Sequence, residues 1–420
     1  MTMKSVGQNI QKLDLQSPEF KQAPEALWRA LRDASAVVTT RQPLLGRISL
    51  TTRYEESRKV LNNTELFSVD ARRCGHTSAA GMRWWVPKLF KPLANNLLTL
   101  DGPEHRALRQ RVDYAFKRTE LNSLQVHIEQ EASRAIGKLR ENIQRNGSAD
   151  FIADVARPVP QYVISKLLGL DDMPDDDSQR LARDLSALGS MQKASDIFTV
   201  IPAIKRISGV LNSQISERRS RPRNDLLTRL IVEEGEGQAL DKDQLLAMTF
   251  LLYVAGHETT THLMSTSLWA ILTNESIAEQ VSTSLDDKSI HEFVRYLSPV
   301  QMSKPRFVLQ DVKFAGTELK KGDTVAALIG AANHDERVFE NPEIFNLEKA
   351  SARHLGFGAG AHACFGLHLA LRETSTVINK LLQDPTLHLA PARRAFEWNR
   401  RLGLRSLKYL HVSNRKVTHF

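Results

Sequence analysis

The stretch HLGFGAGAHACFG, residues 354–366, is the most informative part of this chain. Its four glycines surround an aromatic side chain, a histidine and Cys364, directly before an apolar run with helical periodicity. Glycine lets the backbone approach a flat ligand closely, and the amides and dipole at a helix start stabilise a thiolate. The stretch therefore predicts a cysteine thiolate that is presented to a flat, buried cofactor.

Three other interpretations of this stretch explain less. The glycines of 356–361 fit the dinucleotide fingerprint G-x-G-x-x-A, but that fingerprint needs a preceding buried strand, and NLEKASARH, 346–354, does not form one. A zinc site of His362, Cys364 and His368 lacks a CxxC pair and a common ligand spacing. An inert core cysteine is the usual fate of a lone thiol, but it gives the glycines no purpose.

Residues 357–366, FGAGAHACFG, resemble the haem-binding signature of the cytochrome P450 family, F-G-x-G-x-H-x-C-x-G, at every fixed position. The resemblance implies a soluble haem-thiolate enzyme of the bacterial type. In it, Cys364 is the metal ligand to the iron of haem b (iron protoporphyrin IX), and Phe357, Gly358 and Gly366 bind the cofactor. The resemblance covers residues 24–413, with the other motifs of the family in order.

The clearest single element is DKDQLLAMTFLLYVAGHETTTHLMSTSLWAIL, residues 241–272. Apolar residues occupy nearly all its faces, as in a helix that passes through the centre of a protein, and Asp241 is a suitable N-cap. A glycine and three consecutive threonines interrupt its middle, although these residues are poor helix formers. Such a break in local preference marks a functional position.

The interruption contains AGHETT, residues 255–260, which resembles the oxygen-activation motif A-G-x-[DE]-T-[TS] of the same family. The resemblance implies that Ala255 and Gly256 bind the cofactor and leave space for dioxygen. It also implies that Glu258 and Thr259 are catalytic and deliver protons to the distal oxygen.

A zinc-protease helix is the alternative interpretation of this segment, because His257, Glu258 and His262 lie close together. The motif HExxH needs its second histidine at the position of Thr261, one residue before His262. The observed spacing puts the two histidines on different faces of the helix, which argues against zinc.

Haem carries two propionates, which need cationic partners. DGPEHRALR, residues 101–109, resembles the family's D-x-P-x-H-x-x-x-R segment, so the resemblance implies that His105 and Arg109 bind them. Their spacing of four residues puts both on one face of a helix. By the same resemblance, Arg306 in RFVLQDVKFAG and His354 occupy the remaining propionate-binding positions.

The expected fold class is mainly α with a minor β region. The resemblance makes it the cytochrome P450 fold, which is triangular and helix-rich, with a long central helix over the haem. No Pro- or Ser-rich linker divides the chain, so we expect a single domain over residues 1–420, with residues 1–20 as a flexible N-terminal segment. EFVR, Glu292 to Arg295, resembles the family's E-x-x-R motif, which braces the fold behind the haem.

The chain has a formal net charge of +9, from 57 basic and 48 acidic residues. Its basic residues are scattered rather than clustered, so we expect no nucleic-acid binding. With two cysteines and no signal peptide or membrane span in the sequence, we expect a cytoplasmic monomer without a membrane anchor.

The resemblance implies a monooxygenase that inserts one oxygen atom from O2 into a hydrophobic small molecule, by hydroxylation or epoxidation. No flavin or nicotinamide module is present, so electrons come from a ferredoxin- or flavodoxin-type donor with its NAD(P)H reductase. A peroxide-driven peroxygenase and a non-catalytic haem sensor are the alternatives. The intact Glu258–Thr259 pair favours the monooxygenase, because neither alternative needs a proton path.

By resemblance, substrate contacts are expected from three segments: the loop 72–97 with Trp84 and Trp85, the helix face around 251–254, and Val300–Pro305. Leu371 stands where the family usually has an arginine. That position is expected near the surface that receives the electron donor.

Overall fold

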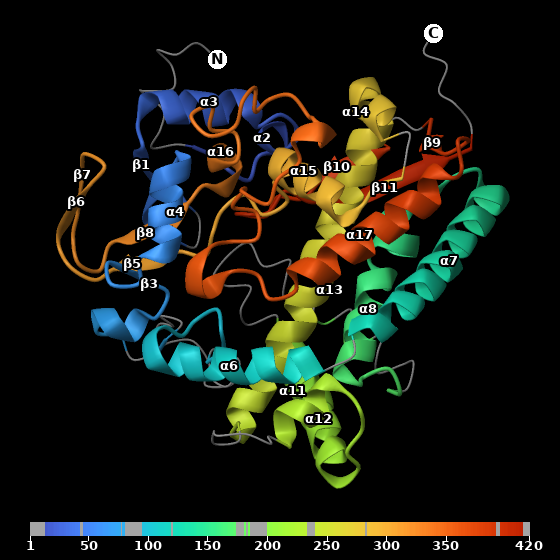
Figure 1. Cartoon of the computed structure of the whole chain (residues 1–420), viewed down its shortest axis with the longest axis horizontal. Helices are drawn as coiled ribbons and strands as arrows, with labels where there is room; N and C mark the ends of the chain where they lie inside the picture. Colours follow the sequence, from blue (N-terminus) through green and yellow to red (C-terminus); the bar gives the residue numbers. More distant parts are fainter. Residues whose placement is uncertain are drawn as a thin grey trace.

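The longest described helix, α13 (Lys242–Thr273), runs through the middle of the molecule in this computed structural model (Figure 1). Asp241 caps it, as the sequence predicts: its Oδ1 accepts from the backbone N–H of Gln244 at 2.8 Å, while Oε1 of Gln244 accepts from the N–H of Asp241 at 3.1 Å. Its 32 residues correspond to roughly 48 Å of helix. Helices α8, α11, α15 and α17 all contact it, so α13 is the axis of the core.

The structure describes residues 13–42, 45–76, 78–79, 95–118, 121–173, 180–181, 184, 200–232, 240–281, 284–391 and 395–414. The remaining α-helices within these ranges are α2 (Pro18–Gln22), α3 (Glu25–Ala34), α4 (Tyr54–Asn62), α6 (Gly102–Arg118), α7 (Leu121–Asn146), α8 (Pro158–Leu168), α11 (Ile201–Ser220), α12 (Leu226–Ile231), α14 (Glu275–Gln280), α15 (Asp287–Leu297), α16 (Ile329–Ala332) and α17 (Leu367–Leu382). Short 3-10 turns are η2 (Ala71–Cys74), η5 (Leu347–Lys349) and η6 (Gly360–His362), and η4 (Ile152–Ala156) is a π-helical turn.

The β-strands form a minor part of the fold on one side of the helices and near the C-terminus (Figure 1). A five-stranded sheet has the order β1-β2-β8-β5-β3, in which only the β2–β8 pairing is parallel. A second sheet has the order β10-β11-β4, with β9 also pairing β11, and β6 and β7 form a hairpin. The strands are β1 (Val37–Gln42), β2 (Gly46–Thr51), β3 (Phe67–Ser68), β4 (Ala149–Asp150), β5 (Arg306–Val308), β6 (Val312–Phe314), β7 (Thr317–Leu319), β8 (Thr324–Ala327), β9 (His388–Leu389), β10 (Phe396–Trp398) and β11 (Leu407–Ser413).

The predicted pair of Glu292 and Arg295 is present on α15 and is buried. Nη2 of Arg295 lies 2.7 Å from Oε1 of Glu292, and Nη1 donates to the carbonyl oxygens of Asn333 and Pro342 at 3.1 and 2.7 Å. The backbone N–H of Leu355 donates to Oδ1 of Asn333 at 2.8 Å. The pair therefore ties α15 to the irregular segment that leads into the cysteine stretch.

One expectation about local structure is wrong. Residues 13–20 are not a flexible segment, because Leu15 and Phe20 are buried against Trp28 of α3 in a small apolar cluster, and residues 1–12 lie outside the described part. Strand β8 ends at Ala327, and shortly after it comes the one-turn helix α16, whose glycine packs against Trp28.

Candidate haem and oxygen site

The cysteine loop is a tight backbone structure that ends at the start of α17. The N–H of Cys364 donates to the carbonyl oxygen of Phe357 at 2.7 Å, which closes the loop. Gly358 has a φ of 71°, and a side chain there would also come within 3.2 Å of the carbonyl oxygen of His362. Gly366 is the N-cap of α17, and a Cβ there would contact nothing within 4 Å among the described atoms. The loop thus leaves room on its outer side, next to Cys364.

Cys364 is exposed as a residue, but protein atoms lie around its sulfur. Burial raises the pKa of this thiol, while a hydrogen bond from the backbone N–H of Gly366 and the charge of Arg109 lower it. The thiol has no disulfide partner. It is therefore placed to bind a metal that lies on the open side of the loop.

Helix α6 packs its predicted motif directly against the cysteine loop. Nη1 of Arg109 donates to the carbonyl oxygen of Ala363 at 3.0 Å, and its guanidinium lies 5.2 Å from the ring centre of Phe365. In turn, Nε2 of His362 in the loop lies 2.7 Å from Oδ1 of Asp101, the first residue of the α6 motif. Two motifs about 260 residues apart in sequence are thus one contiguous structure.

His362 is a fixed position of the haem signature, to which the sequence assigned no role apart from the rejected zinc site. Its ring centre lies 4.3 Å from that of His105, and its Nδ1 lies 3.0 Å from the carbonyl oxygen of Leu97. Burial would raise the pKa of Asp101, but hydrogen bonds from His362 and Ser68 lower it to about 2. The fixed histidine of the signature was the available signal, and its role is to join the loop to α6.

Two of the residues predicted to contact the propionates are buried and have ring or guanidinium nitrogens without a hydrogen-bond partner among the described residues. Arg306 and His105 are each 2% exposed, and Nε and Nη1 of Arg306 and Nε2 of His105 have no hydrogen-bond partner among the described residues. Burial lowers the pKa of His105 to about 4 and also lowers that of Arg306. A buried guanidinium without a partner is costly, so these atoms fit an anionic ligand such as a carboxylate.

His354 does not join these residues. Its Nε2 lies 2.9 Å from Nδ1 of His291 on α15, and its Nδ1 accepts from the backbone N–H of Gly356 at 3.1 Å. Both nitrogens are used inside the protein, so the structure contradicts the expected contact between His354 and a propionate. Burial lowers the pKa of His354 to about 3, which keeps its ring neutral. Its role is to hold the start of the cysteine loop against α15.

The middle of α13 is open, although both flanks of the helix are buried. Ala255 and Thr259 are exposed and lie four residues apart, on one face. Oγ1 of Thr259 donates to the carbonyl oxygen of Ala255 at 2.9 Å, so its lone pairs remain free to accept a further hydrogen bond. An opening at the centre of a buried helix is a site where a small molecule can meet a hydroxyl group.

Gly256 has a packing role that the sequence did not indicate. A methyl group at this position would come within 2.7 Å of Cδ1 of Ile164 on α8. The glycine therefore lets α8 and α13 approach closely behind the face that carries Ala255 and Thr259.

Glu258 is ion-paired with Arg401, which comes from the turn before β11. Burial would raise the pKa of Glu258, but the hydrogen bond and charge of Arg401 outweigh it and lower the pKa. Arg401 stands in the run NRRLGLRSL, where nothing in the sequence distinguishes it from its neighbours. Sequence reasoning therefore missed it.

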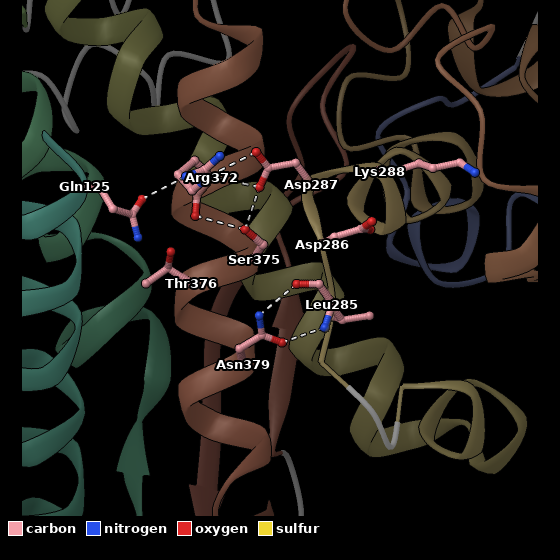
Figure 2. A pocket seen from close by; sticks show the side chains of 9 residues that line it. All are labelled: Gln125, Leu285, Asp286, Asp287, Lys288, Arg372, Ser375, Thr376 and Asn379. Atoms are coloured by element: carbon pink, nitrogen blue, oxygen red, sulfur yellow. Dashed lines mark hydrogen bonds and ion pairs between the residues drawn. The ribbon is translucent and has the colours of Figure 1, made fainter. Parts of the chain in front are cut away.

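A polar surface hollow of 470 Å³ lies beside the second half of α17 (Figure 2). Arg372 lines it and pairs with Asp287 at 3.0 Å. None of the predicted site residues lines it. Leu371, the residue before Arg372, is 2% exposed, so its own side chain is not part of the surface.

Comparisons with known proteins agree with this geometry. The family model described as Cytochrome P450 matches residues 35–411. The polyketide biosynthesis cytochrome P450 PksS of Bacillus subtilis is 32% identical over 324 residues, which are 76% of this chain and 78% of that protein. Its structure has a TM-score of 0.84 at 28% identity and covers 96% of this chain and 100% of that one.

Two further proteins show how widely such relatives differ in their named activities. The vitamin D(3) 25-hydroxylase of Pseudonocardia autotrophica is 30% identical over 381 residues, 90% of each chain. The crystal structure of P450BioI in complex with a hexadecenoic acid-ligated acyl carrier protein has a TM-score of 0.81 at 25% identity, covering 94% of this chain and 99% of that one.

The chain belongs to the cytochrome P450 family. The predicted fold class and enzyme class are thereby confirmed: the protein is a mainly helical cytochrome P450 monooxygenase, an oxidoreductase with a haem-thiolate cofactor. Bacterial members of the family need a redox partner and bind hydrophobic substrates. No helix in the described ranges is long and apolar enough to cross a membrane.

Proposed function

We propose that this protein binds haem b through Cys364 and inserts one oxygen atom from O2 into a hydrophobic small molecule, by hydroxylation or epoxidation. The observation that carries this proposal is the combination of an accessible thiol with buried, unpartnered donors on Arg306 and His105. These are the two kinds of group that an iron porphyrin with carboxylate side chains requires. The open face of α13 supplies the place for dioxygen and substrate.

Each site residue has a distinct role in the proposal. When bound, the haem supplies the activation of dioxygen, which thiolate ligation favours. Cys364 holds the iron, and His105, Arg109 and Arg306 hold the propionates. Thr259 accepts and orients a hydrogen bond at the open face of α13. Glu258, one residue before it, passes protons from solvent towards that hydroxyl group.

The proposed electron donor is an acidic ferredoxin or flavodoxin, reduced by an NAD(P)H-dependent reductase. Support comes from α6, which lies against the cysteine loop and exposes Arg106. A cationic face steers an acidic partner, with screening over a Debye length of about 8 Å at physiological salt. We place the protein in the cytoplasm as a monomer, where Cys74 and Cys364 stay reduced.

A reduced donor and O2 should convert a bound substrate into a product that is one oxygen atom heavier, detected by mass spectrometry. Substrates are found first, by screening a library for a shift in the spin state of the haem. Peroxide without a donor should not replace O2, because the Glu258–Thr259 proton path serves the reductive reaction. Efficient turnover with peroxide alone would favour the peroxygenase instead.

Substitution of Arg306 by glutamine should weaken haem retention. Hydrogen bonds to charged groups contribute roughly 1.5–3 kcal/mol, so haem should transfer to excess apomyoglobin about tenfold to a hundredfold faster. Arg41→Gln, at an exposed position of β1, is the matched control and should leave the transfer rate unchanged.

The apoprotein distinguishes this role from a general structural one. Because Nε and Nη1 of Arg306 have no partner among the described residues, apo Arg306→Gln should unfold at no lower temperature than the wild-type apoprotein. A destabilised apoprotein with unchanged haem transfer would contradict the assignment.

A further inference from the structure

The ion pair between Arg401 and Glu258 joins two segments that are far apart in sequence. The two side chains are 24% and 25% exposed, so the pair is largely shielded from solvent. Glu258 belongs to the centre of α13, whereas Arg401 precedes β11. A shielded charge pair is screened much less than a surface pair, so its two members control each other's ionisation.

The turn that carries Arg401 is fixed by backbone hydrogen bonds to the segment 299–301. Gly403, with a φ of 76°, accepts at its carbonyl oxygen from the N–H of Gln301 at 2.8 Å. The N–H of Arg405 donates to the carbonyl oxygen of Pro299 at 2.8 Å. Arg401 is thus presented from a braced turn rather than from a free loop.

The other titratable groups that face Glu258 are two histidines on α13. His262, one helical turn away, is buried, and neither ring nitrogen has a partner among the described residues. Burial lowers its pKa to about 4, so it is neutral at neutral pH. Burial also lowers the pKa of His257, whose Nδ1 lies 2.7 Å from the carbonyl oxygen of Tyr253. Arg157 acts on both histidines, which leaves Arg401 as the cation paired with Glu258 in the described structure.

We propose that Arg401 is a positioning residue for the oxygen-activation helix, which keeps the Glu258 carboxylate ionised and turned towards the braced turn. The effect of Arg401 on catalysis rests on the proposed role of Glu258 in proton delivery. The side chain of Arg401 donates a hydrogen bond to Oε1 of Glu258, and in the proposal it acts through that carboxylate.

The sign of the expected pH effect follows from the groups around Glu258. In the wild type, the charge of Arg401 outweighs burial and the pKa of Glu258 is lowered. In Arg401→Gln, the two contributions of Arg401 are lost and burial is opposed by the smaller contributions of His262 and His257, so the pKa of Glu258 rises. An opposite charge at this range contributes about 1–3 pH units, so the carboxylate should take up its proton at a correspondingly higher pH.

Infrared titration of the resting holoenzyme measures this directly. The carbonyl stretch of a protonated carboxyl group at position 258 is assigned by its absence in Glu258→Gln. In Arg401→Gln the band should appear at least about one pH unit higher than in the wild type. Arg401→Lys should restore most of the wild-type titration. Arg400→Gln, which removes an exposed pair with Asp14, is the matched control and should titrate like the wild type.

Oxygen coupling provides the second readout. Arg401→Gln should move the pH profile of product formed per O2 consumed in the same direction, with little change in KM. Identical infrared titrations in Arg401→Gln and wild type would overturn the proposal. If Glu258→Gln left coupling unchanged, the proposed proton path would fail instead, and the infrared titration, which needs no turnover, separates the two failures.

Discussion

Replacement of Cys364 by serine is expected to abolish the long-wavelength absorption band of the ferrous carbonyl form. That band would require a thiolate ligand from Cys364, and a serine oxygen would not donate electron density to iron in the same way. The band should be lost completely, together with product formation, while any haem that remains bound absorbs at shorter wavelength. The measurement is the difference spectrum of the reduced protein with and without carbon monoxide.

Cys74→Ser is the control for the loss of a thiol. Cys74 lies in η2, partly buried, and its Sγ donates to the carbonyl oxygen of Val308 at 3.3 Å, a bond that a serine hydroxyl can replace. The band should persist at full intensity in this variant. A normal band in Cys364→Ser with a lost band in Cys74→Ser would show that the ligand has been misassigned.

Replacement of Thr259 by alanine should leave haem content and substrate affinity close to those of the wild type but divert consumed oxygen to hydrogen peroxide. Its hydroxyl lies on the open face of α13, and its bond to the carbonyl oxygen of Ala255 fixes where its lone pairs point. Positioned proton transfer contributes roughly 10²–10⁴-fold, so product formed per O2 consumed should fall by about tenfold or more.

Thr261→Ala is the matched control, because it removes the same kind of bond from a buried position. Oγ1 of Thr261 donates to the carbonyl oxygen of His257 at 2.7 Å. Coupling in this variant should stay near the wild-type value, as judged from product and peroxide yields. Equal yields in Thr259→Ala and wild type would rule out the assigned role of the hydroxyl.

Local sequence was sufficient for the elements that carry the site. The start of α13 follows from the capping box at Asp241, and its burial follows from apolar residues on nearly all of its faces. The loop before α17 follows from glycines at positions such as 358, where φ is positive. The Glu292–Arg295 pair follows from helical spacing. In each case, the determining residues lie within a few positions of one another.

The misses depend on long-range contacts, which no local pattern encodes. His354 was expected at a propionate, but its partner His291 lies 63 residues earlier. Arg401 meets Glu258 across 143 residues, and the nearby arginines in the same run offer no way to single it out. Trp84 and Trp85, expected at the substrate, lie outside the described residues.

Turnover under isotopically labelled dioxygen tests whether this protein transfers an oxygen atom from O2 to its substrate. The protein, its reduced electron donor and a substrate that shifts the haem spin state are incubated with ¹⁸O2 in unlabelled water, and the product is analysed by mass spectrometry. An O2-dependent monooxygenase should give a product that carries one ¹⁸O atom, and Cys364→Ser should not form this labelled product. A product oxygen that comes from water, or an unlabelled product formed equally well without O2, would show that the protein is not such an enzyme.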